Sequence, residues 1–257
     1  MRMKIYARID KNIRTHKKYC DDRILIGNVL LDDGYYEVEK PDGTDLVIAV
    51  ADGVGGRPDG WRAASLSLQG LTVLNDSGIV DKQTVLETVA AVNDELLRRS
   101  GVPGMASTLS FLKMADRTAT LFHLGDTRIY SLSSIQGYTV FRAVTSDQNR
   151  LAALRCGDDA DPEEIKRNAP DWDHITAYMG MATKELREEA MIVENLPLTG
   201  SFLFTSDGVH DYVPEAALRE LLAAESDHRK KIEDVMALAR EHGSADDQSV
   251  ILLRAEG

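Results

Sequence analysis

The chain has 257 residues, 43% of them apolar, which is enough to bury the core of one ordinary domain. Its formal net charge of −12 and isoelectric point near 5.0 exclude the broad basic surface that nucleic acid or an anionic membrane would require. Its two cysteines, Cys20 and Cys156, have no CxxC spacing or neighbouring histidine cluster, so they suggest neither a disulfide framework nor a zinc site.

The first residues, MRMKIYARIDKN, are charged and contain no apolar core of a signal peptide. No stretch of the sequence approaches the roughly 18 apolar residues that a bilayer-spanning helix needs. We therefore expect one soluble, monomeric domain over residues 1–257 in the cytoplasm, without a membrane or nucleic-acid partner.

Strand and helix signals alternate in the first half of the chain. The segment RILIGNVLLDDGYYEVE, residues 23–39, predicts a hairpin that turns at Asp33-Gly34. DLVIAVADG, residues 45–53, predicts a strand buried on both faces. Apolar residues then recur at intervals of three and four over 61–75 and 83–99, which predicts two amphipathic helices.

The second half begins with another strand block. STLSFLKMADRTATLFHLGDTRIYSL, residues 107–132, predicts paired strands that turn at 115–117. Residues 146–190 are polar, carry Pro162 and Pro170, and read as a mostly helical insertion over one edge.

The end of the chain returns to strands around a helical pair. SFLFTSDGV (201–209) and SVILLRA (249–255) predict strands, and the periodicity predicts helices over 214–225 and 229–242. Strands grouped together, then helices, then strands again indicate an α+β fold and not a βαβ repeat.

Two of the five Asp-Gly pairs differ from the rest. Asp-Gly is a turn dipeptide, and the polar, aromatic or proline neighbours of Asp33, Asp42 and Asp59 suit a turn. Asp52-Gly53 and Asp207-Gly208 instead follow runs of buried-type residues, so each carboxylate would lie half inside the protein. Burial of a bare carboxylate is costly unless a positive charge compensates it.

Acidic residues also stand beside other predicted strands: Asp22, Asp126, and Asp246 with Asp247. If these strand ends meet, several like charges would share one site and would need counter-cations to stay ionised. Ligands that are all oxygen suit Mg²⁺ or Mn²⁺ better than zinc. The sequence therefore indicates a divalent-metal site.

Glycines would serve such a site, because Gly53, Gly55 and Gly56 allow ions and a bound ligand to approach the backbone. The alternative, which spacing along the chain leaves open, is that each aspartate is only a turn or helix-cap residue.

Six motifs resemble, in order, those of the PPM-type, or type 2C, metal-dependent protein serine/threonine phosphatases. They are VADGVGG (50–56), ASTLSFL (106–112), GDTRIY (125–130), VTSDQ (144–148), TSDGVHD (205–211) and GSADDQSVILL (243–253). The compact DGVGG form is similar to that of the bacterial branch. The resemblance runs from about Lys17 to Leu253 and implies a four-layer α-β-β-α sandwich of two antiparallel sheets flanked by helix pairs, with 146–190 as the variable flap.

The resemblance also implies roles for individual residues. Asp52 matches the carboxylate that bridges two catalytic metals, and the carbonyl of Gly53 matches a ligand of one of them. Asp207 and Asp246 match the remaining ligands of the first metal. Asp22 matches the residue that acts on the second metal, largely through waters.

The implied reaction is hydrolysis of phosphoserine and phosphothreonine on proteins, by water that two Mn²⁺ or Mg²⁺ ions activate and without a covalent intermediate. The implied substrates are phosphoproteins made by a cytosolic serine/threonine kinase. Asp126 and Asp207 match a third, weaker divalent site of bacterial members.

Three positions depart from the family's pattern. Lys17 stands where the family has an arginine that holds phosphate, and it lacks the two-pronged geometry of a guanidinium. Asp247 replaces the usual asparagine and adds a negative charge whose effect the sequence does not fix. Val54 stands where some members have histidine, which leaves His210 as a candidate proton donor or as a structural residue.

Two other functions are compatible with the sequence. The altered segment Lys17–Asp22 admits a pseudophosphatase, a regulatory module that binds phosphoproteins without turnover. A phosphatase specific for a small molecule or for one regulatory phosphoprotein is also open, and the segment 146–190 would decide it.

Overall fold

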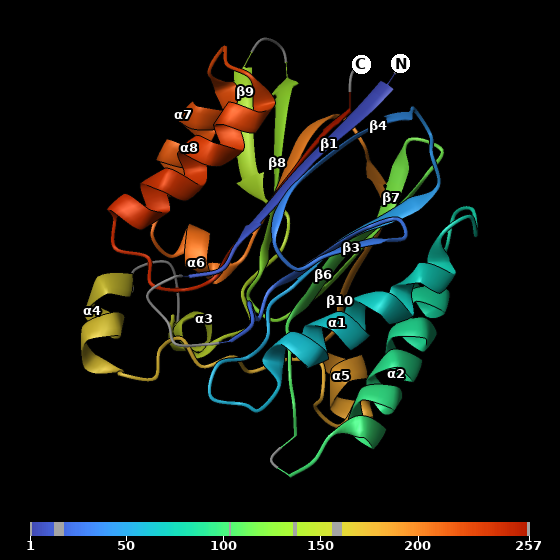
Figure 1. Ribbon diagram of the computed structural model, residues 1–257, viewed down its shortest axis with the longest axis vertical. Helices are drawn as coiled ribbons and strands as arrows, with labels where there is room; N and C mark the ends of the chain where they lie inside the picture. Colours follow the sequence, from blue (N-terminus) through green and yellow to red (C-terminus); the bar gives the residue numbers. More distant parts are fainter. Residues whose placement is uncertain (1, 13–17, 103, 136–137, 156–160, 256–257) are drawn as a thin grey trace.

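Two six-stranded antiparallel sheets stack face to face in the computed structural model, which describes residues 2–12, 18–102, 104–135, 138–155 and 161–255 (Figure 1). The strand order of the first sheet is β4 (Gly34–Pro41), β1 (Arg2–Asp10), β12 (Gln248–Ala255), β11 (Gly200–Thr205), β8 (Arg128–Ile135) and β9 (Tyr138–Ala143). That of the second sheet is β10 (Met191–Pro197), β7 (Thr118–Leu124), β6 (Leu109–Ala115), β5 (Leu46–Ala51), β2 (Arg23–Ile26) and β3 (Val29–Leu31).

Helices cover the outer face of each sheet (Figure 1). The second sheet carries α1 (Gly60–Gly70) and α2 (Lys82–Arg99), and the first carries α7 (Glu215–Ala223) and α8 (His228–Glu241). The remaining elements are short: a 3-10 turn (Leu71–Leu74), α3 (Arg150–Leu154), α4 (Pro162–Asn168), α5 (Thr183–Glu189) and α6 (Asp207–His210). The expected α-β-β-α sandwich is thus confirmed.

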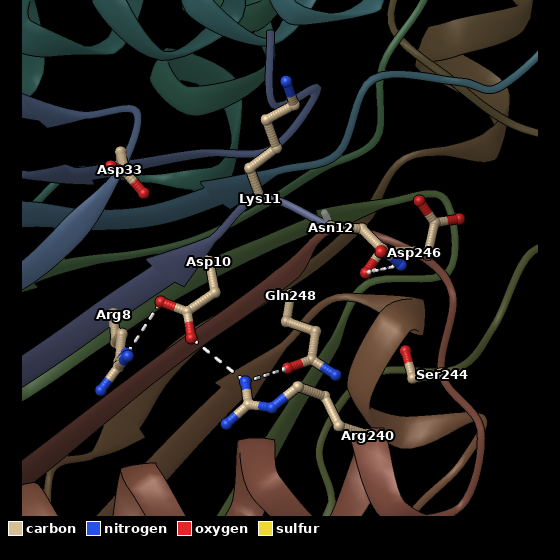
Figure 2. Close-up of a pocket in the computed structure, with 9 residues that line it drawn as sticks. All are labelled: Arg8, Asp10, Lys11, Asn12, Asp33, Arg240, Ser244, Asp246 and Gln248. Carbon is tan, nitrogen blue, oxygen red and sulfur yellow. Dashed lines mark hydrogen bonds and ion pairs between the residues drawn. The ribbon is translucent and has the colours of Figure 1, made fainter. Parts of the chain in front are cut away.

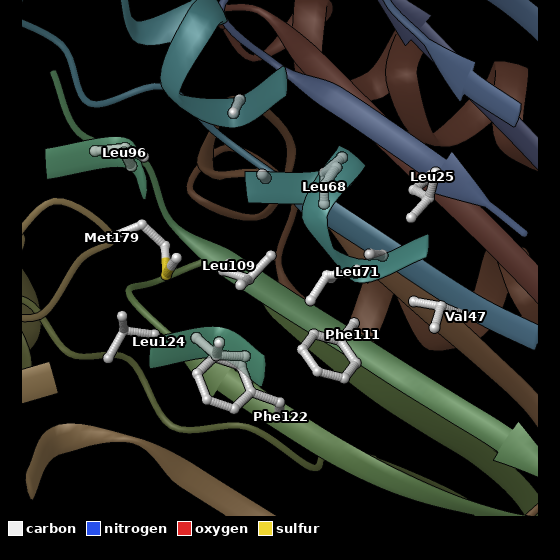
Figure 3. Packing of buried hydrophobic residues seen from close by; sticks show 14 of the residues in the cluster. Leu25, Val47, Leu68, Leu71, Leu96, Leu109, Phe111, Phe122, Leu124 and Met179 are labelled. Atoms are coloured by element: carbon white, nitrogen blue, oxygen red, sulfur yellow. The ribbon is translucent and has the colours of Figure 1, made fainter. Parts of the chain in front are cut away.

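Three apolar clusters fill the three interfaces between the four layers. Alternation along the strands creates them, because successive side chains of a strand point to opposite faces. On β5, Val47 and Ala49 pack toward the helices, whereas Ile48 and Val50 pack toward the other sheet. Figure 3 shows part of the first cluster, in which Leu68 of α1 belongs to the same buried group as Val47.

Most of the predicted elements are present close to their predicted bounds. The turn at 115–117 joins β6 to β7, and the predicted helices correspond to α1 with the 3-10 turn, α2, α7 and α8. In the segment 146–190 the structure describes three short helices, while residues 156–160 lie outside the described part.

The hairpin predicted to turn at Asp33-Gly34 is wrong. The strand pair β2 and β3 turns at Gly27-Asn28 instead, with Ile26 opposite Val29. From Gly34 the chain continues in the other sheet, where β4 pairs with β1. A turn dipeptide shows where the chain bends, but it does not show which strands pair on either side.

Three strands were not predicted: β1, β9 and β10. The signal for β1 was available, because Met3, Ile5, Ala7 and Ile9 alternate with more polar or aromatic residues and enter the core between the sheets. The strand β10 is harder to predict from sequence, because its register against β7 shifts between Val193 and Leu196 and interrupts the alternation.

None of the helices in the described part of the chain combines the length and the apolar content needed to cross a bilayer.

Candidate metal centre

Five aspartates from separate elements lie near one another at the ends of the strands. Asp52 follows β5, Asp126 lies between β7 and β8, Asp207 opens α6 after β11, Asp22 precedes β2, and Asp246 precedes β12. Burial raises the pKa of Asp52 well above its usual range, and the charges of the other four raise it further. The structure therefore brings together five of the six aspartates singled out in the sequence, and the sixth, Asp247, is the residue after Asp246.

Several oxygens of this acidic cluster are buried without a hydrogen-bond partner: both carboxylate oxygens of Asp22, Oδ1 of Asp126 and Oδ1 of Asp207. Buried polar atoms in proteins are almost always satisfied, so orphaned carboxylate oxygens need an explanation. Desolvation raises the pKa of Asp22 from 3.8 to about 7, although the nearby hydroxyls of Ser206 and Ser249 act to lower it without reaching hydrogen-bond geometry.

The other carboxyls respond to burial in the same direction. Desolvation, followed by repulsion from Asp147 and Asp211, raises the pKa of Asp126 to about 7. Desolvation, followed by the charges of Asp126 and Asp246, raises the pKa of Asp207 well above its usual range. Each of these groups is therefore poorly stabilised as a bare anion.

Two arginines near this acidic cluster, one buried (Arg23) and one partly buried (Arg128), are engaged with other partners. Arg128 forms a two-pronged pair with Asp147, through Nε to Oδ1 at 2.8 Å and Nη2 to Oδ2 at 2.6 Å. Arg23 donates from Nη1 to the carbonyl oxygens of Cys20 and Asp22, at 2.7 and 2.5 Å. Among the described residues, burial outweighs the effect of these arginines on the carboxyl pKa values, and an all-oxygen set of this kind fits a hard divalent cation.

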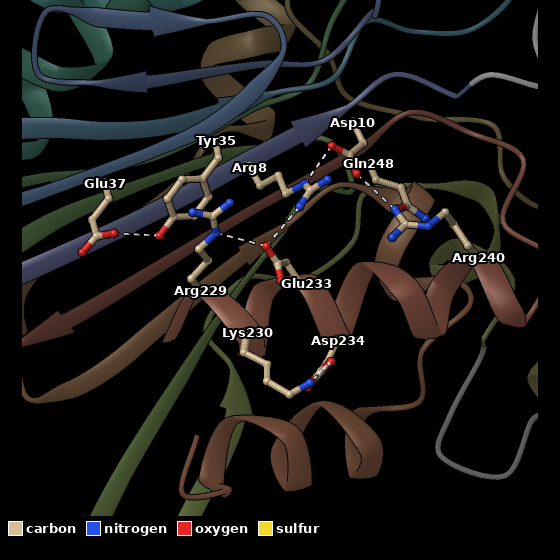
Figure 4. Close-up of polar contacts among 10 residues, drawn as sticks. All are labelled: Arg8, Asp10, Tyr35, Glu37, Arg229, Lys230, Glu233, Asp234, Arg240 and Gln248. Atoms are coloured by element: carbon tan, nitrogen blue, oxygen red, sulfur yellow. Dashed lines mark hydrogen bonds and ion pairs between the residues drawn. The ribbon is translucent and has the colours of Figure 1, made fainter. Parts of the chain in front are cut away.

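A contrasting group of charges lies beside Asp246, in a cavity of about 600 Å³ (Figure 2). Here Asp10 accepts from Nε of Arg8 at 2.8 Å and from Nη1 of Arg240 at 3.1 Å. Figure 4 shows further ion pairs along α8, among them the pair between Nη1 of Arg8 on β1 and Oε1 of Glu233 on α8, at 3.5 Å. Asp10 therefore has two arginine partners, whereas Asp22, Asp126 and Asp207 have buried carboxylate oxygens without a hydrogen-bond partner.

The carboxylates are close enough to shift one another's pKa values, yet their side chains are not arranged as a complete set of metal ligands. Among the residues that the structure describes, no three His, Cys, Asp or Glu side chains already have the arrangement of an ion-binding group. Ions of the Mg²⁺ type keep several waters and need only one or two direct carboxylate ligands each, so loosely spaced acceptors can still serve them.

The main chain around Asp52 is fixed from two sides. The amide of Asp52 donates to Oγ1 of Thr108 at 2.9 Å, and the amide of Thr108 donates back to the carbonyl of Asp52 at 2.8 Å. A Cβ on Gly53 would lie 2.3 Å from the carbonyl carbon of Gly60, so this glycine lets α1 approach. Nothing lies within 4 Å of a Cβ placed on Gly55. What approaches Gly53 in the structure is the backbone of α1; the approach of ions and a ligand to these glycines stays a prediction.

Asp207 and Asp246 are held together through their neighbours. A Cβ on Gly208 would lie 1.9 Å from the carbonyl oxygen of Asp247, so only glycine permits this approach. Ser244 donates from Oγ to the carbonyl of Gly208 at 2.7 Å. These contacts dock the first turn of α6 against the segment that leads into β12.

The turn that carries Asp126 is joined to the start of the segment 146–190. Gly125 has a φ of 110°, and its amide donates to Oε1 of Gln148 at 2.8 Å. The amide of Gln148 donates back to the carbonyl of Gly125 at 2.8 Å. The Arg128–Asp147 pair strengthens the same junction.

His210 is placed as a structural residue. It is 7% exposed, its Nδ1 lies 2.9 Å from Oγ1 of Thr205, and burial holds its pKa well below the usual value. His123 is also buried, between Oγ of Ser110 and the carbonyl of Ser146, and desolvation lowers its pKa to about 4. Neither ring is an imidazolium acid near neutral pH. Lys17 lies outside the described residues.

Known proteins resemble this chain over nearly its whole length. The serine/threonine phosphatase stp of Listeria monocytogenes serotype 4b is 26% identical over 255 residues, which cover 94% of this chain and 96% of that protein. A search against models of protein families finds no match.

Solved structures share the fold. The serine/threonine phosphatase Stp1 of Staphylococcus aureus superposes with a TM-score of 0.79 at 21% identity, covering 98% of this chain and 95% of that one. The catalytic domain of the protein phosphatase PstP, solved in complex with two manganese ions, superposes with a TM-score of 0.73 at 22% identity, and 99% of each chain is covered. The resemblance indicated by the six motifs is thereby confirmed.

The metal-free protein should lose stability as the pH rises. Asp22 and Asp126 keep their protons up to about pH 7 when folded and lose them near 3.8 when unfolded, so the folded state binds more protons between these values. Stability therefore falls as the pH rises through this window and stays low above it. Thermal melting in chelator from pH 4.5 to 8 measures this effect.

Asp22→Asn should flatten that decline, whereas Asp42→Asn, at an Asp-Gly turn, should leave it unchanged. Because a cation binds the ionised carboxylates, Mn²⁺ should raise the melting temperature more at pH 8 than at pH 5. If the melting temperature of Asp22→Asn fell with pH as steeply as that of the wild type, the raised pKa assigned to Asp22 would be contradicted.

Gly53→Ala should destabilise the protein while Gly55→Ala should not. The new methyl group at position 53 meets the backbone of Gly60, and such overpacking costs about 1–3 kcal/mol of the free energy of unfolding. The methyl at position 55 enters open space, so we expect a change within about 0.5 kcal/mol. Urea unfolding of both variants checks this, and equal losses would show that the contact with α1 is unimportant.

Proposed function

We propose that this chain, as a bacterial-type member of the PPM-type phosphatases, is a metal-dependent protein serine/threonine phosphatase. The observation that carries the proposal is the acidic cluster: carboxylates of Asp22, Asp126 and Asp207 are buried with unpartnered oxygens at a point where strands of both sheets end. Its shared fold and its sequence similarity with named serine/threonine phosphatases support the same conclusion. The relatives' names give no support to the non-catalytic alternative.

The same residues would hold the ions. Asp52, Asp207, Asp246 and the carbonyl of Gly53 would hold the first ion, and Asp52 with Asp22 would hold the second. Divalent ions bound there supply Lewis-acid chemistry, lowering the pKa of a water molecule and offsetting charge on the phosphoryl oxygens.

The protein's own contribution is to bind and orient. Thr108 fixes the main chain at Asp52, and the docking of Gly208 against Asp247 fixes Asp207 relative to Asp246. Because His210 is buried and neutral, we do not assign it as the proton donor to the leaving serine or threonine oxygen.

Further features of the activity belong to the same proposal. The two ions are Mn²⁺ or Mg²⁺, and Asp126 with Asp207 forms a third, weaker site. The substrates are cytosolic proteins phosphorylated by a serine/threonine kinase, and Lys17 contributes to phosphate binding. We also propose that residues 1–257 form one monomeric domain in which 146–190 is the flap that selects the substrate.

Substitution of a proposed ligand tests the function directly. With Mn²⁺, the wild-type protein should hydrolyse phosphoserine and phosphothreonine peptides, and chelator should abolish turnover. Asp207→Asn should lower kcat by at least about a hundredfold, because loss of an ion removes several kcal/mol of transition-state stabilisation.

Asp42→Asn is the matched control, since Asp42 precedes a glycine like Asp207 but lies in a turn where it faces Arg117, with Oδ2 to Nε at 3.3 Å. Its kcat should equal that of the wild type. Turnover that persists in chelator, or a fully active Asp207→Asn variant, would refute the proposal.

A further inference from the structure

Asp247 uses both of its carboxylate oxygens to hold the main chain of one segment. The residue is 2% exposed, and its Oδ1 accepts from the amide of Asn12 at 2.8 Å while its Oδ2 accepts from the amide of Asp21 at 2.7 Å. Asn12 follows β1 and Asp21 precedes β2, so the two donors come from opposite ends of the connection between the two sheets. One side chain thus fixes both ends of that connection.

The contacts continue from Asp21 to the acidic cluster and to α1. Asp22, whose buried oxygens have no partner, is the next residue after the amide that Asp247 binds. The side chain of Asp21 accepts from the amide of Trp61 in the first turn of α1 at 3.0 Å. The position of Asp22 therefore depends on a backbone that Asp247 and α1 hold from two sides.

Asp247 is equally tied to Asp246. The amide of Asp247 donates to Oδ1 of Asp246 at 2.8 Å, and Nδ2 of Asn12 donates to the carbonyl of Asp246 at 3.2 Å. Figure 2 shows Asn12 beside Asp246 at the edge of the cavity. Gly208 packs against the carbonyl of Asp247, so the residue after Asp207 also contacts Asp247.

Only a carboxylate can make both main-chain bonds in this geometry. An asparagine side chain has one oxygen that accepts, while its nitrogen donates and would face an amide hydrogen. Hydrogen bonds to an ionised acceptor are also stronger than neutral ones, which offsets the burial of the Asp247 charge. The departure from the family's asparagine at this position therefore has a structural consequence.

We propose that Asp247 is a positioning residue, which holds Asp22 and Asp246 at the separation that the metal centre requires without itself being a ligand. The inference rests on the proposed function, because it assumes that these two carboxylates bind ions. Residues that orient metal ligands typically affect metal affinity by about tenfold or more when they are substituted.

Two variants separate position from charge. Asp247→Asn keeps the shape and removes one acceptor, whereas Asp247→Glu keeps the charge and moves the carboxylate. We expect both to bind Mn²⁺ about tenfold more weakly in calorimetric titration. Wild-type Mn²⁺ affinity in Asp247→Glu would show that only the charge of Asp247 matters, and would overturn the proposal. Affinity within about twofold of wild type in Asp247→Asn would overturn it as well.

Asp81→Asn is the matched control. Asp81 also accepts a main-chain hydrogen bond, from the amide of Thr84 at 2.8 Å, but it caps α2 and is not part of the acidic cluster. Its Mn²⁺ affinity should equal that of the wild type. A tenfold loss in this control as well would show that the titration does not report on the Asp247 contacts, and would count against the proposal.

Amide hydrogen exchange provides a readout that needs neither metal nor activity. In the metal-free wild type the amides of Asn12 and Asp21 should be protected, and Asp247→Asn should speed the exchange of at least one of them. If the wild type binds no Mn²⁺, the proposed function fails while this measurement still decides whether Asp247 holds the segment. Unprotected amides in the wild type would overturn the inference even if neither variant folds.

Discussion

The arrangement of this protein depends on carboxylates that are buried with oxygens for which the described residues supply no hydrogen-bond partner. Other acidic side chains near the core have partners: Asp147 has Arg128, Asp10 has Arg8 and Arg240, and Asp247 has two main-chain amides. Asp22 is 1% exposed, and both of its oxygens lack a hydrogen-bond partner. A buried carboxylate of this kind destabilises a fold unless a cation or a hydrogen-bond donor binds it. We therefore interpret the aspartate cluster as a functional site, whose cost in stability the rest of the core offsets.

The support comes from backbone contacts. Gly53 against Gly60 lets α1 approach the strand end that carries Asp52, and Gly208 against Asp247 does the same for α6 and the segment before β12. Both approaches are too close for any side chain. The three apolar clusters between the layers keep the sheets in place, and these glycine contacts set the finer positions of the aspartates at their ends.

Much of this could be predicted from the sequence where a local pattern determines the outcome. The apolar runs before Asp52 and Asp207 became strands β5 and β11, because buried strands require such runs. Pairing was harder to predict: the turn at Asp33-Gly34 was assigned to the wrong pair of strands, since β3 and β4 belong to different sheets. The strand β1 was missed although its alternation is regular.

The sequence did not indicate the role of Asp247, and it left two roles open for His210. The partners of Asp247 are main-chain amides, which every non-proline residue possesses, so the sequence carries no signature of them. His210 lies within the motif TSDGVHD, which suggests chemistry, and only its burial against Thr205 shows that it is neutral. Long-range backbone contacts and burial depend on the complete fold.

The central claim is that these scattered aspartates form one metal centre, and anomalous diffraction from crystals grown with Mn²⁺ tests it most directly. We expect two strong manganese peaks among Asp22, Asp52, Asp207 and Asp246, with Asp52 between the two ions. Ordered crystals without a peak at these carboxylates, or with manganese bound only elsewhere, would contradict the account.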